Sequence, residues 1–179
     1  MPNTRLARFR EHKDDYFAHG DHSPLTPAQR AAFRGLEYFD EDPDVAFTVP
    51  LDRTGPGIDE RIALDTTDGD RVEFVRAGRI AFLINGQTVT LSVLKDLARG
   101  RYFLPFRDET AGTETYVIGR YLDPQERPDG ALIVDFNYAY NPYCAYSDGW
   151  SCPIPPAENE APVRIAAGER TFGHDAASG

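Results

Sequence analysis

Apolar side chains recur at helical spacing near the start of the chain and at strand spacing through most of the remainder. Residues 4–18 place Leu6 and Phe17 near one stripe of a helix, and Gly20 supplies a stop signal. A second, shorter helix is indicated within residues 23–35. We expect both helices to serve packing, because neither carries a polar cluster suited to chemistry.

The start of the second helix has its own local pattern. Thr26 is suited to cap the N-terminus, Pro27 fits the first helical position, and Gln29 completes a capping box. Gly35 would end the helix. These residues together predict where the helix begins more firmly than its apolar pattern does.

After Asp44 the pattern changes to short runs rich in β-branched and aromatic residues, with turn signals at close intervals. Most of the remaining chain is therefore predicted to be β-structure. The predicted strands are residues 46–51, 61–64, 71–75, 79–84, 87–93, 102–106, 115–122, 131–138 and 163–165.

Two turn signals indicate how neighbouring strands are connected. A type I′ turn at Asn85-Gly86 would set Phe82 opposite Val89 and place the apolar residues on one face. At residues 68–69, Asp-Gly, a two-residue loop would pair an apolar residue with a charged one, so we expect a longer or bulged connection. The Asn85-Gly86 pairs would be Ile84 with Gln87, Phe82 with Val89, and Ile80 with Leu91.

Successive hairpins with few helices favour a mainly β fold. We predict an antiparallel β-barrel or a strongly curved sheet with one or two N-terminal helices packed on it, and a sandwich is the alternative. A chain of 179 residues has the size of a single domain. Within it we expect a helical cap (1–44), a β core (45–170) and a flexible tail (171–179).

Charge and composition limit the kinds of partner that the protein is expected to bind. The net charge of −10 works against binding to nucleic acid and to anionic membrane surfaces. No apolar run is long enough to cross a membrane, and the charged opening MPNTRLARFREHKDDYF lacks the apolar core of an export signal. We therefore expect a cytoplasmic protein, and the sequence gives no oligomeric state.

No motif identifies a reaction or a cofactor. The chain has no Gly-rich phosphate loop after a strand, no GxSxG and no HExxH. Cys144 and Cys152 lack the neighbours of a zinc site, and we interpret them as buried thiols, with a local disulfide as the alternative. His19 and His22 are expected to be solvated, so no metal site is predicted.

Two segments concentrate polar and aromatic side chains. Residues 103–122 carry arginines and carboxylates, and residues 135–156 carry tyrosines, asparagines and the single tryptophan. We expect the two segments to form a cleft in which arginine fixes an anionic ligand and aromatic rings stack on a planar one, such as a flavin, a sugar or a base. The predicted ligand-binding residues are Arg107, Asp108, Tyr116, Arg120, Tyr121, Asn137, Tyr140, Asn141, Tyr143 and Trp150.

Other interpretations of the same residues stay open. The charged groups can neutralise one another in a structural network, and the aromatic rings can seal a β core. A hydrolase or isomerase would use Asp135 or Glu114 as general base, with Asn137 or Asn141 stabilising negative charge. A protein interaction module without a pocket is the third alternative.

The two segments also resemble a known family. FLPFRDETAGTETYVIGRYL followed by DFNYAYNPYCAYSDGWSCPIPPAENEAPVRIAAGER is similar to the uncharacterised bacterial and archaeal family catalogued as domain of unknown function 1684. The resemblance extends to the EHKDDYF and SPLTPAQRAAFRGLEYF segments, and thus to most of the chain. It implies no reaction or ligand, because none is established for that family.

Overall fold

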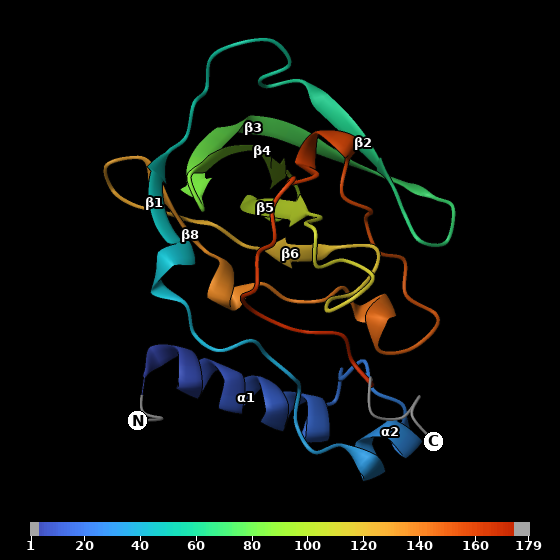
Figure 1. Ribbon diagram of the computed structural model, residues 1–179. Helices are drawn as coiled ribbons and strands as arrows, with labels where there is room; N and C mark the ends of the chain where they lie inside the picture. Colours follow the sequence, from blue (N-terminus) through green and yellow to red (C-terminus); the bar gives the residue numbers. More distant parts are fainter. Residues whose placement is uncertain (1–3, 174–179) are drawn as a thin grey trace.

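The computed structural model describes residues 4–173 of the protein. Within that range the fold is mainly β, with two antiparallel sheets and two α-helices, which lie beside one another at one end of the molecule (Figure 1). The predicted β-rich class with N-terminal helices is confirmed. The described strands form two separate sheets and do not close into a barrel.

The larger sheet has five strands in the order β2-β3-β4-β5-β6. β3 joins two of the predicted strands and bends strongly in Figure 1, and its register with β4 shifts between Arg76 and Gly78. Such a bulge increases local twist, which is consistent with a curved sheet. The strands are β2 (Arg61–Asp65), β3 (Arg71–Ile84), β4 (Gln87–Asp96), β5 (Arg101–Phe106) and β6 (Arg120–Leu122).

The smaller sheet has three strands in the order β1-β8-β7. Along β8, Leu132 and Val134 are buried and Ile133 between them is exposed, so one face of this sheet packs on the core. The two-residue β7 was not predicted, because it is too short to show a pattern. The strands are β1 (Ala46–Pro50), β7 (Gln125–Glu126) and β8 (Ala131–Asp135).

The hairpin predicted at Asn85-Gly86 is confirmed, with Phe82 opposite Val89. Both turn residues have positive φ, 51° and 78°, as a type I′ turn requires. The connection between β2 and β3 spans residues 66–70, so the longer loop that we expected there is also confirmed. Local turn chemistry thus gave the correct register at Asn85-Gly86 and the correct kind of connection at residues 68–69.

Both predicted helices are present. Helix α1 (Arg5–His19) begins after Thr4, whose side chain caps it, and ends at Gly20. Helix α2 (Pro27–Ala32) has the predicted capping box but ends before Gly35, because the backbone becomes extended directly after it. The remaining helical turns are short 3₁₀ segments: η1 (Pro43–Val45), η2 (Phe136–Tyr138), η3 (Tyr143–Ala145) and η4 (Ala157–Asn159).

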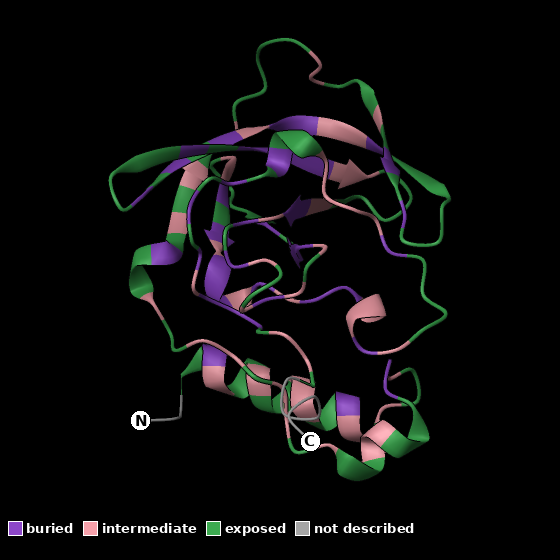
Figure 2. Ribbon diagram, turned by 45° about the vertical axis from the view of Figure 1, so that its right-hand side comes forward, coloured by how far each residue is buried: buried purple, intermediate pink, exposed green. Residues whose placement is uncertain are grey.

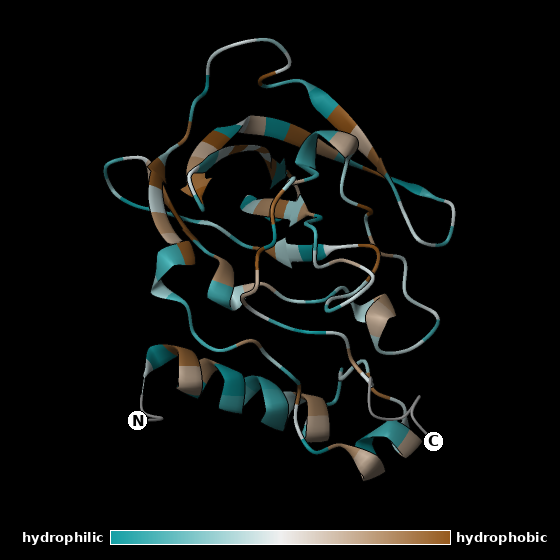
Figure 3. Cartoon of the chain, in the orientation of Figure 1, coloured by the Kyte–Doolittle hydropathy of each residue, from teal (hydrophilic) through white to brown (hydrophobic). Residues whose placement is uncertain are grey.

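The main hydrophobic core draws on both sheets. Leu91 of β4 and Leu132 of β8 are fully buried in it, together with Phe136 of η2. Figure 2 shows the buried residues on the sheet strands and the exposed ones mostly on loops and the helices, and Figure 3 shows the most hydrophobic residues on the strands. Residues 161–167 complete this core without forming a strand.

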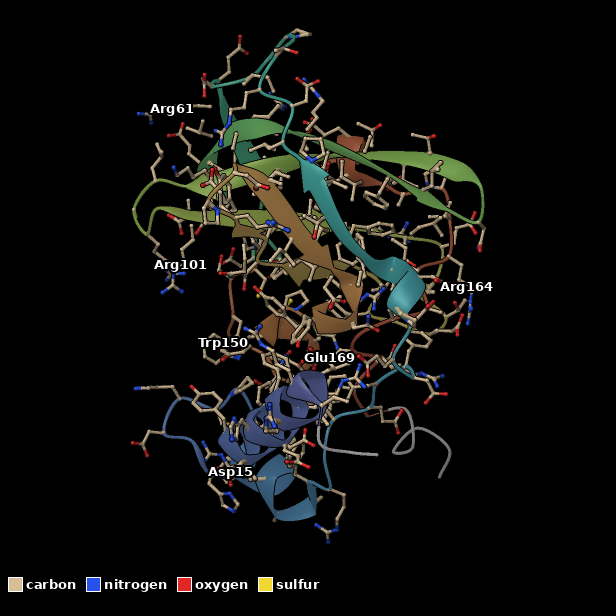
Figure 4. The ribbon with its side chains drawn as sticks, turned by 90° about the vertical axis from the view of Figure 1, so that its left-hand side faces the viewer. Asp15, Arg61, Arg101, Trp150, Arg164 and Glu169 are labelled. Atoms are coloured by element: carbon tan, nitrogen blue, oxygen red, sulfur yellow. The ribbon has the colours of Figure 1, made fainter. Side chains whose placement is uncertain are left out.

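Helix α1 docks through apolar and polar contacts. The rings of Phe9 and Tyr138 meet edge to face at 5.0 Å between centroids. Lys13 forms an ion pair with the buried Glu169, with Nζ 2.8 Å from Oε2. Figure 4 shows Glu169 beside the helix. The helix is therefore attached to a segment near the far end of the chain.

Two of the predicted strands are longer than the strands in the structure. β6 begins only at Arg120 rather than at residue 115, because Thr110 directs its hydroxyl to Asp108 and Thr115 and holds residues 108–115 in a turn. β8 ends at Asp135 rather than at residue 138. The Asp135 carboxylate there accepts from the backbone N–H two residues on and caps η2 instead.

The strand predicted at residues 163–165 is wrong. The Ile165 carbonyl accepts a hydrogen bond from a guanidinium, and its N–H donates to a carboxylate, so side chains replace strand neighbours. Beyond this segment, Phe172 packs on Tyr146 with 5.2 Å between ring centroids. The rest of the predicted flexible tail, residues 174–179, lies outside the described residues.

No helix within residues 4–173 combines the length and the apolar character needed to span a bilayer.

Candidate functional site

An isolated bridge between Tyr121 and Tyr140 joins the two segments singled out in the sequence. The backbone N–H of each residue donates to the carbonyl of the other, at 2.9 and 3.0 Å. Tyr121 belongs to β6, so the bridge fixes the tyrosine-rich segment against the edge of the five-stranded sheet. The register between these two segments, which the sequence left undetermined, follows from this contact.

A partly open pocket of about 1010 Å³ lies beside this bridge. Its walls come from the β4–β5 turn, from β5, from the chain after β6 and from residues 140–153. The lining residues are Phe74, Asp96, Arg99, Gly100, Arg101, Tyr102, Phe103, Tyr121, Asp123, Pro124, Gln125, Glu126, Tyr140, Asn141, Pro142, Tyr143, Trp150, Ser151, Cys152 and Pro153.

Aromatic rings make up much of the pocket wall. Tyr121 contacts Phe103 edge to face at 4.7 Å and Tyr140 at 5.8 Å between ring centroids. On the opposite segment Tyr143 and Trp150 meet at 5.1 Å. Because each ring is held by another ring, the wall keeps its shape and offers apolar faces to a ligand.

One carboxylate within the pocket has a partner and a shifted pKa. The Tyr140 hydroxyl donates to both oxygens of Asp123, at 3.0 Å from each. The residue Asp123 is exposed, but protein atoms crowd its carboxylate, and this partial burial raises its pKa. Burial and the nearby Asp123 charge raise the pKa of Tyr140 above the normal tyrosine range. At neutral pH Tyr140 is therefore the proton donor of the pair.

Positive charge reaches the pocket from two sides. Lys13 lies behind Tyr140, with Nζ 5.1 Å from the ring centroid. Arg101 is exposed at the rim, and within residues 4–173 it makes no ion pair or side-chain hydrogen bond. Figure 4 shows Arg101 and Trp150 on the same side of the molecule, with Arg101 directed into solvent. Arg101 is thus a cation that an anionic group could reach.

The other charged residues of the pocket are already paired. Asp96 lies 3.9 Å from Arg99, and Glu126 interacts with Arg53 at 3.3 Å. Asn141 also lines the pocket, and within the described range its buried Oδ1 has no hydrogen-bond partner. A hydrogen-bond donor on a ligand, or a water molecule, would satisfy this oxygen.

The predicted ligand residues divide into two groups. Tyr121, Tyr140, Asn141, Tyr143 and Trp150 line the pocket. The other five, which include both predicted arginines, lie elsewhere. They are Arg107, Asp108, Tyr116, Arg120 and Asn137.

Arg120 and Asp108 form a closed structural network. Both side chains are 1% exposed, and the Arg120 guanidinium donates to Asp108 at 3.4 Å. Arg120 also donates to the carbonyls of three residues of the C-terminal segment, which leaves no room for a ligand at this guanidinium. These residues are Ile165, Ala167 and Glu169.

The remaining predicted residues also have protein partners. Arg107 donates to the Val117 carbonyl at 2.9 Å and lines a second, smaller cavity of about 310 Å³. Asn137 exchanges hydrogen bonds with the backbone of Asp42. The Tyr116 hydroxyl lies 3.5 Å from the sulfur of Cys144. All three side chains hold neighbouring segments together.

Neither predicted general base lies in the pocket. Asp135 caps η2 by accepting from Asn137 at 2.9 Å. Glu114 forms a two-bond ion pair with Arg164, which lowers the pKa of Glu114. Asp123, which the sequence analysis did not select, is the pocket carboxylate with a raised pKa. Its only sequence signal is its position directly after a predicted strand.

No group of three or more metal-ligating side chains lies close together within residues 4–173. The imidazoles of His19 and His22 do not line the pocket.

Comparisons with known proteins show to which family the chain belongs. A family model described as "Protein of unknown function (DUF1684)" matches residues 31–170, and the chain belongs to that family. The chain is similar to an uncharacterized protein from Haloarcula marismortui whose structure was solved in solution by NMR. The two sequences are 36% identical, the TM-score is 0.70, and the match covers 95% of this chain and 94% of that chain. The comparison with curated proteins gave no match. These relationships show the family and the fold and indicate no specific function.

Proposed function

We propose that the protein binds a small planar molecule in the pocket beside Tyr140. The observation that carries this proposal is a partly open cavity of about 1010 Å³ whose wall combines aromatic rings with charged and polar side chains. Ligand pockets generally have about this size, and they combine apolar and aromatic surface with convergent polar groups. The function is that of a ligand-binding β domain acting in the cytoplasm.

The free polar groups define the ligand more closely. Arg101 makes no ion pair or side-chain hydrogen bond within the described residues, although its charge acts on Asp123, and it would bind an anionic group at the rim. Asp123 would accept a hydrogen bond from an N–H or O–H of the ligand. Trp150 and Tyr143 are placed to cover a flat ring. A planar molecule with one anionic substituent and one donor would use all of these groups.

A thermal-shift screen of planar metabolites, flavins and nucleobases included, tests this proposal. We expect at least one compound to raise the melting temperature of the wild-type protein. Trp150→Ala should weaken its binding about 10-fold, since stacking on an aromatic side chain contributes about 1.4 kcal/mol or more. Arg101→Gln should weaken only ligands that carry an anionic group.

Matched variants outside the pocket control the screen. Leu83→Ala removes a side chain that is 60% exposed on β3, and Arg71→Gln removes an exposed arginine paired with Asp65. Neither residue lines the pocket, so binding should be unchanged in both. The proposal is wrong if no compound shifts the melting temperature, or if the pocket variants bind every hit as tightly as wild type.

The Asp123–Tyr140 pair supports a second candidate function, acid–base catalysis on a bound ligand. A carboxylate with a raised pKa in a pocket is a suitable general base. This candidate differs from the earlier one based on Asp135 or Glu114, which lie outside the pocket. Any activity found in a substrate screen should be lost in Asp123→Asn and retained in Glu114→Gln. The reverse result would contradict this second candidate function.

A further inference from the structure

The two cysteines of the chain meet at the pocket wall. Cys144 lies in η3, and Cys152 follows eight residues later. Both are free thiols, and their side chains interact with each other. Thr67 fixes the second cysteine, because its backbone N–H donates to the Cys152 carbonyl at 3.0 Å and its hydroxyl accepts from the Cys152 N–H at 3.2 Å.

Hydrogen-bond donors surround the sulfur of Cys144. The Tyr116 hydroxyl lies 3.5 Å from it, and the Cys152 thiol and the Thr67 hydroxyl also interact with it. The bond from Cys152 is the largest cause that lowers the pKa of Cys144, to about 6, with Tyr116 next among the donors. The bond to Cys144 and burial raise the pKa of Cys152. Of the two thiols, Cys144 is therefore the more acidic.

The pair can be reached from solvent. Cys152 is only 6% exposed but lines the large pocket, and Cys144 is half-buried. A small molecule that enters the pocket therefore reaches Cys152 without unfolding of the chain, and the partly exposed Cys144 interacts with that residue. An acidic thiol that is accessible and next to a second thiol is the arrangement found in oxidation-sensitive cysteine pairs.

We infer that Cys144 and Cys152 are a reversible oxidation site, in which a hydroperoxide converts the two thiols into a disulfide at the pocket wall. The site does not depend on the proposed ligand. Oxidation would change the pocket, since Cys152 and the neighbouring Tyr143 both line it.

The reaction balances in two steps. The Cys144 thiolate attacks one peroxide oxygen, the O–O bond breaks, and the leaving oxygen takes a proton to become water or an alcohol. Cys144 is then a sulfenic acid. The Cys152 sulfur attacks Cys144, the S–O bond breaks, and the departing hydroxide takes the Cys152 proton to form water. Two thiols are oxidised and one peroxide is reduced, and an added dithiol reverses the change.

The test uses the full native chain and hydrogen peroxide, followed by a thiol-alkylating reagent and intact-mass measurement. We expect the wild-type protein to lose two hydrogens, to take up no alkyl group, and to regain both thiols with dithiothreitol. In Cys152→Ser, a sulfenic-acid trap should label Cys144, at least 10-fold more than it labels Cys152 in Cys144→Ser. Tyr116→Phe should slow the wild-type reaction at pH 7 without preventing it.

The same chain unfolded in urea is the matched control. An unfolded thiol has a pKa near 8.5, so at pH 6.5 the native protein should react faster than the unfolded chain. Two alkylated thiols in the peroxide-treated native protein would overturn the inference. A disulfide formed between chains, or native oxidation no faster than in urea, would overturn it as well, and neither outcome requires a variant to fold.

Discussion

The Tyr140 hydroxyl donates a hydrogen bond to each carboxylate oxygen of Asp123, at 3.0 Å in both cases. The two residues come from segments that the Tyr121–Tyr140 bridge brings together. This contact places a hydrogen-bonded acid in the wall of the pocket beside Tyr140, and it affects how that acid should titrate.

Tyr140→Phe should raise the pKa of Asp123 further. Burial already raises this pKa, and the hydrogen bond from Tyr140 is the largest effect that opposes the rise. Without the Tyr140 hydroxyl, less opposes the rise that burial causes in the pKa of Asp123. Titration of the Asp123 carboxyl carbon by NMR measures the pKa in both proteins. A pKa that is unchanged or lower in Tyr140→Phe would show that the hydrogen bond is absent in solution.

Asp123→Asn should stabilise the protein slightly at pH 7. The folded-state pKa of Asp123 is raised, so the folded protein binds this proton more tightly than the unfolded chain does. The corresponding stability is fully present below pH about 4 and is lost as pH rises through the folded-state pKa. Asparagine does not titrate, so it does not lose stability in this way. The free energy of unfolding should therefore rise by only a few tenths of a kcal/mol, because Asp123 is exposed and solvent weakens the effect.

Urea unfolding of wild type and Asp123→Asn at pH 7 and at pH 4 measures this difference. The stabilities of the two proteins should differ less at pH 4, where a larger fraction of Asp123 is protonated in both the folded protein and the unfolded chain than at pH 7. Asp148→Asn is the control, because Asp148 is exposed and its side chain makes no hydrogen bond or ion pair within residues 4–173. A difference that grows toward pH 4 would contradict the prediction.

Arg120→Met should destabilise the protein by about 3–5 kcal/mol. The substitution leaves the buried carboxylate of Asp108 without its cation, and loss of one partner of a buried ion pair has this cost. The carbonyls that Arg120 binds also lose their donor. Urea unfolding followed by circular dichroism measures the change, and failure to fold would agree with it.

Two further variants make this prediction specific. Adding Asp108→Asn to Arg120→Met should recover part of the lost stability, since no buried charge then remains. Arg61→Met removes an exposed arginine from its pair with Glu73 and should cost less than about 1 kcal/mol. Equal effects of Arg61→Met and Arg120→Met would be incompatible with a buried network at Arg120.

Lys13→Met should loosen helix α1 from the rest of the fold. The Glu169 carboxylate keeps the Tyr146 hydroxyl and the Asn141 N–H as donors but loses its only described cation, at a cost of about 2 kcal/mol. Amide hydrogen exchange should become faster in α1 and near Glu169, with little change in β3 and β4. Glu11→Gln, on the exposed face of the same helix, should leave exchange unaltered.

Features that depend on neighbouring residues could be predicted from the sequence. The capping box between Thr26 and Gln29 and the turn at Asn85-Gly86 both require contacts within a few residues, and both are present. The end of β8 at Asp135 was missed because a strand pattern continues past it. Only the direction of the Asp135 side chain, toward its own backbone, stops the strand.

The candidate site was predictable in part for the same reason. The tyrosines and Trp150 stand out as a local cluster, and several of them line the pocket. Arg120 has the same appearance in sequence as a ligand-binding arginine. Its partners Ile165 and Ala167 are more than 40 residues away and are brought to it only by the fold. Asp123 and Arg101 have no local pattern, and the bridge at Tyr140 is what gives them a role.

The ion pair between Lys13 and Glu169 spans 156 positions of the chain. At a ribosomal rate of roughly 5–20 residues per second, the lysine emerges about 8–30 s before its partner is made. During that interval the newly made α1 lacks its polar anchor, and Phe17 lacks the buried surface formed by Tyr146. The helix made first during translation is therefore expected to be one of the last elements to reach its native place.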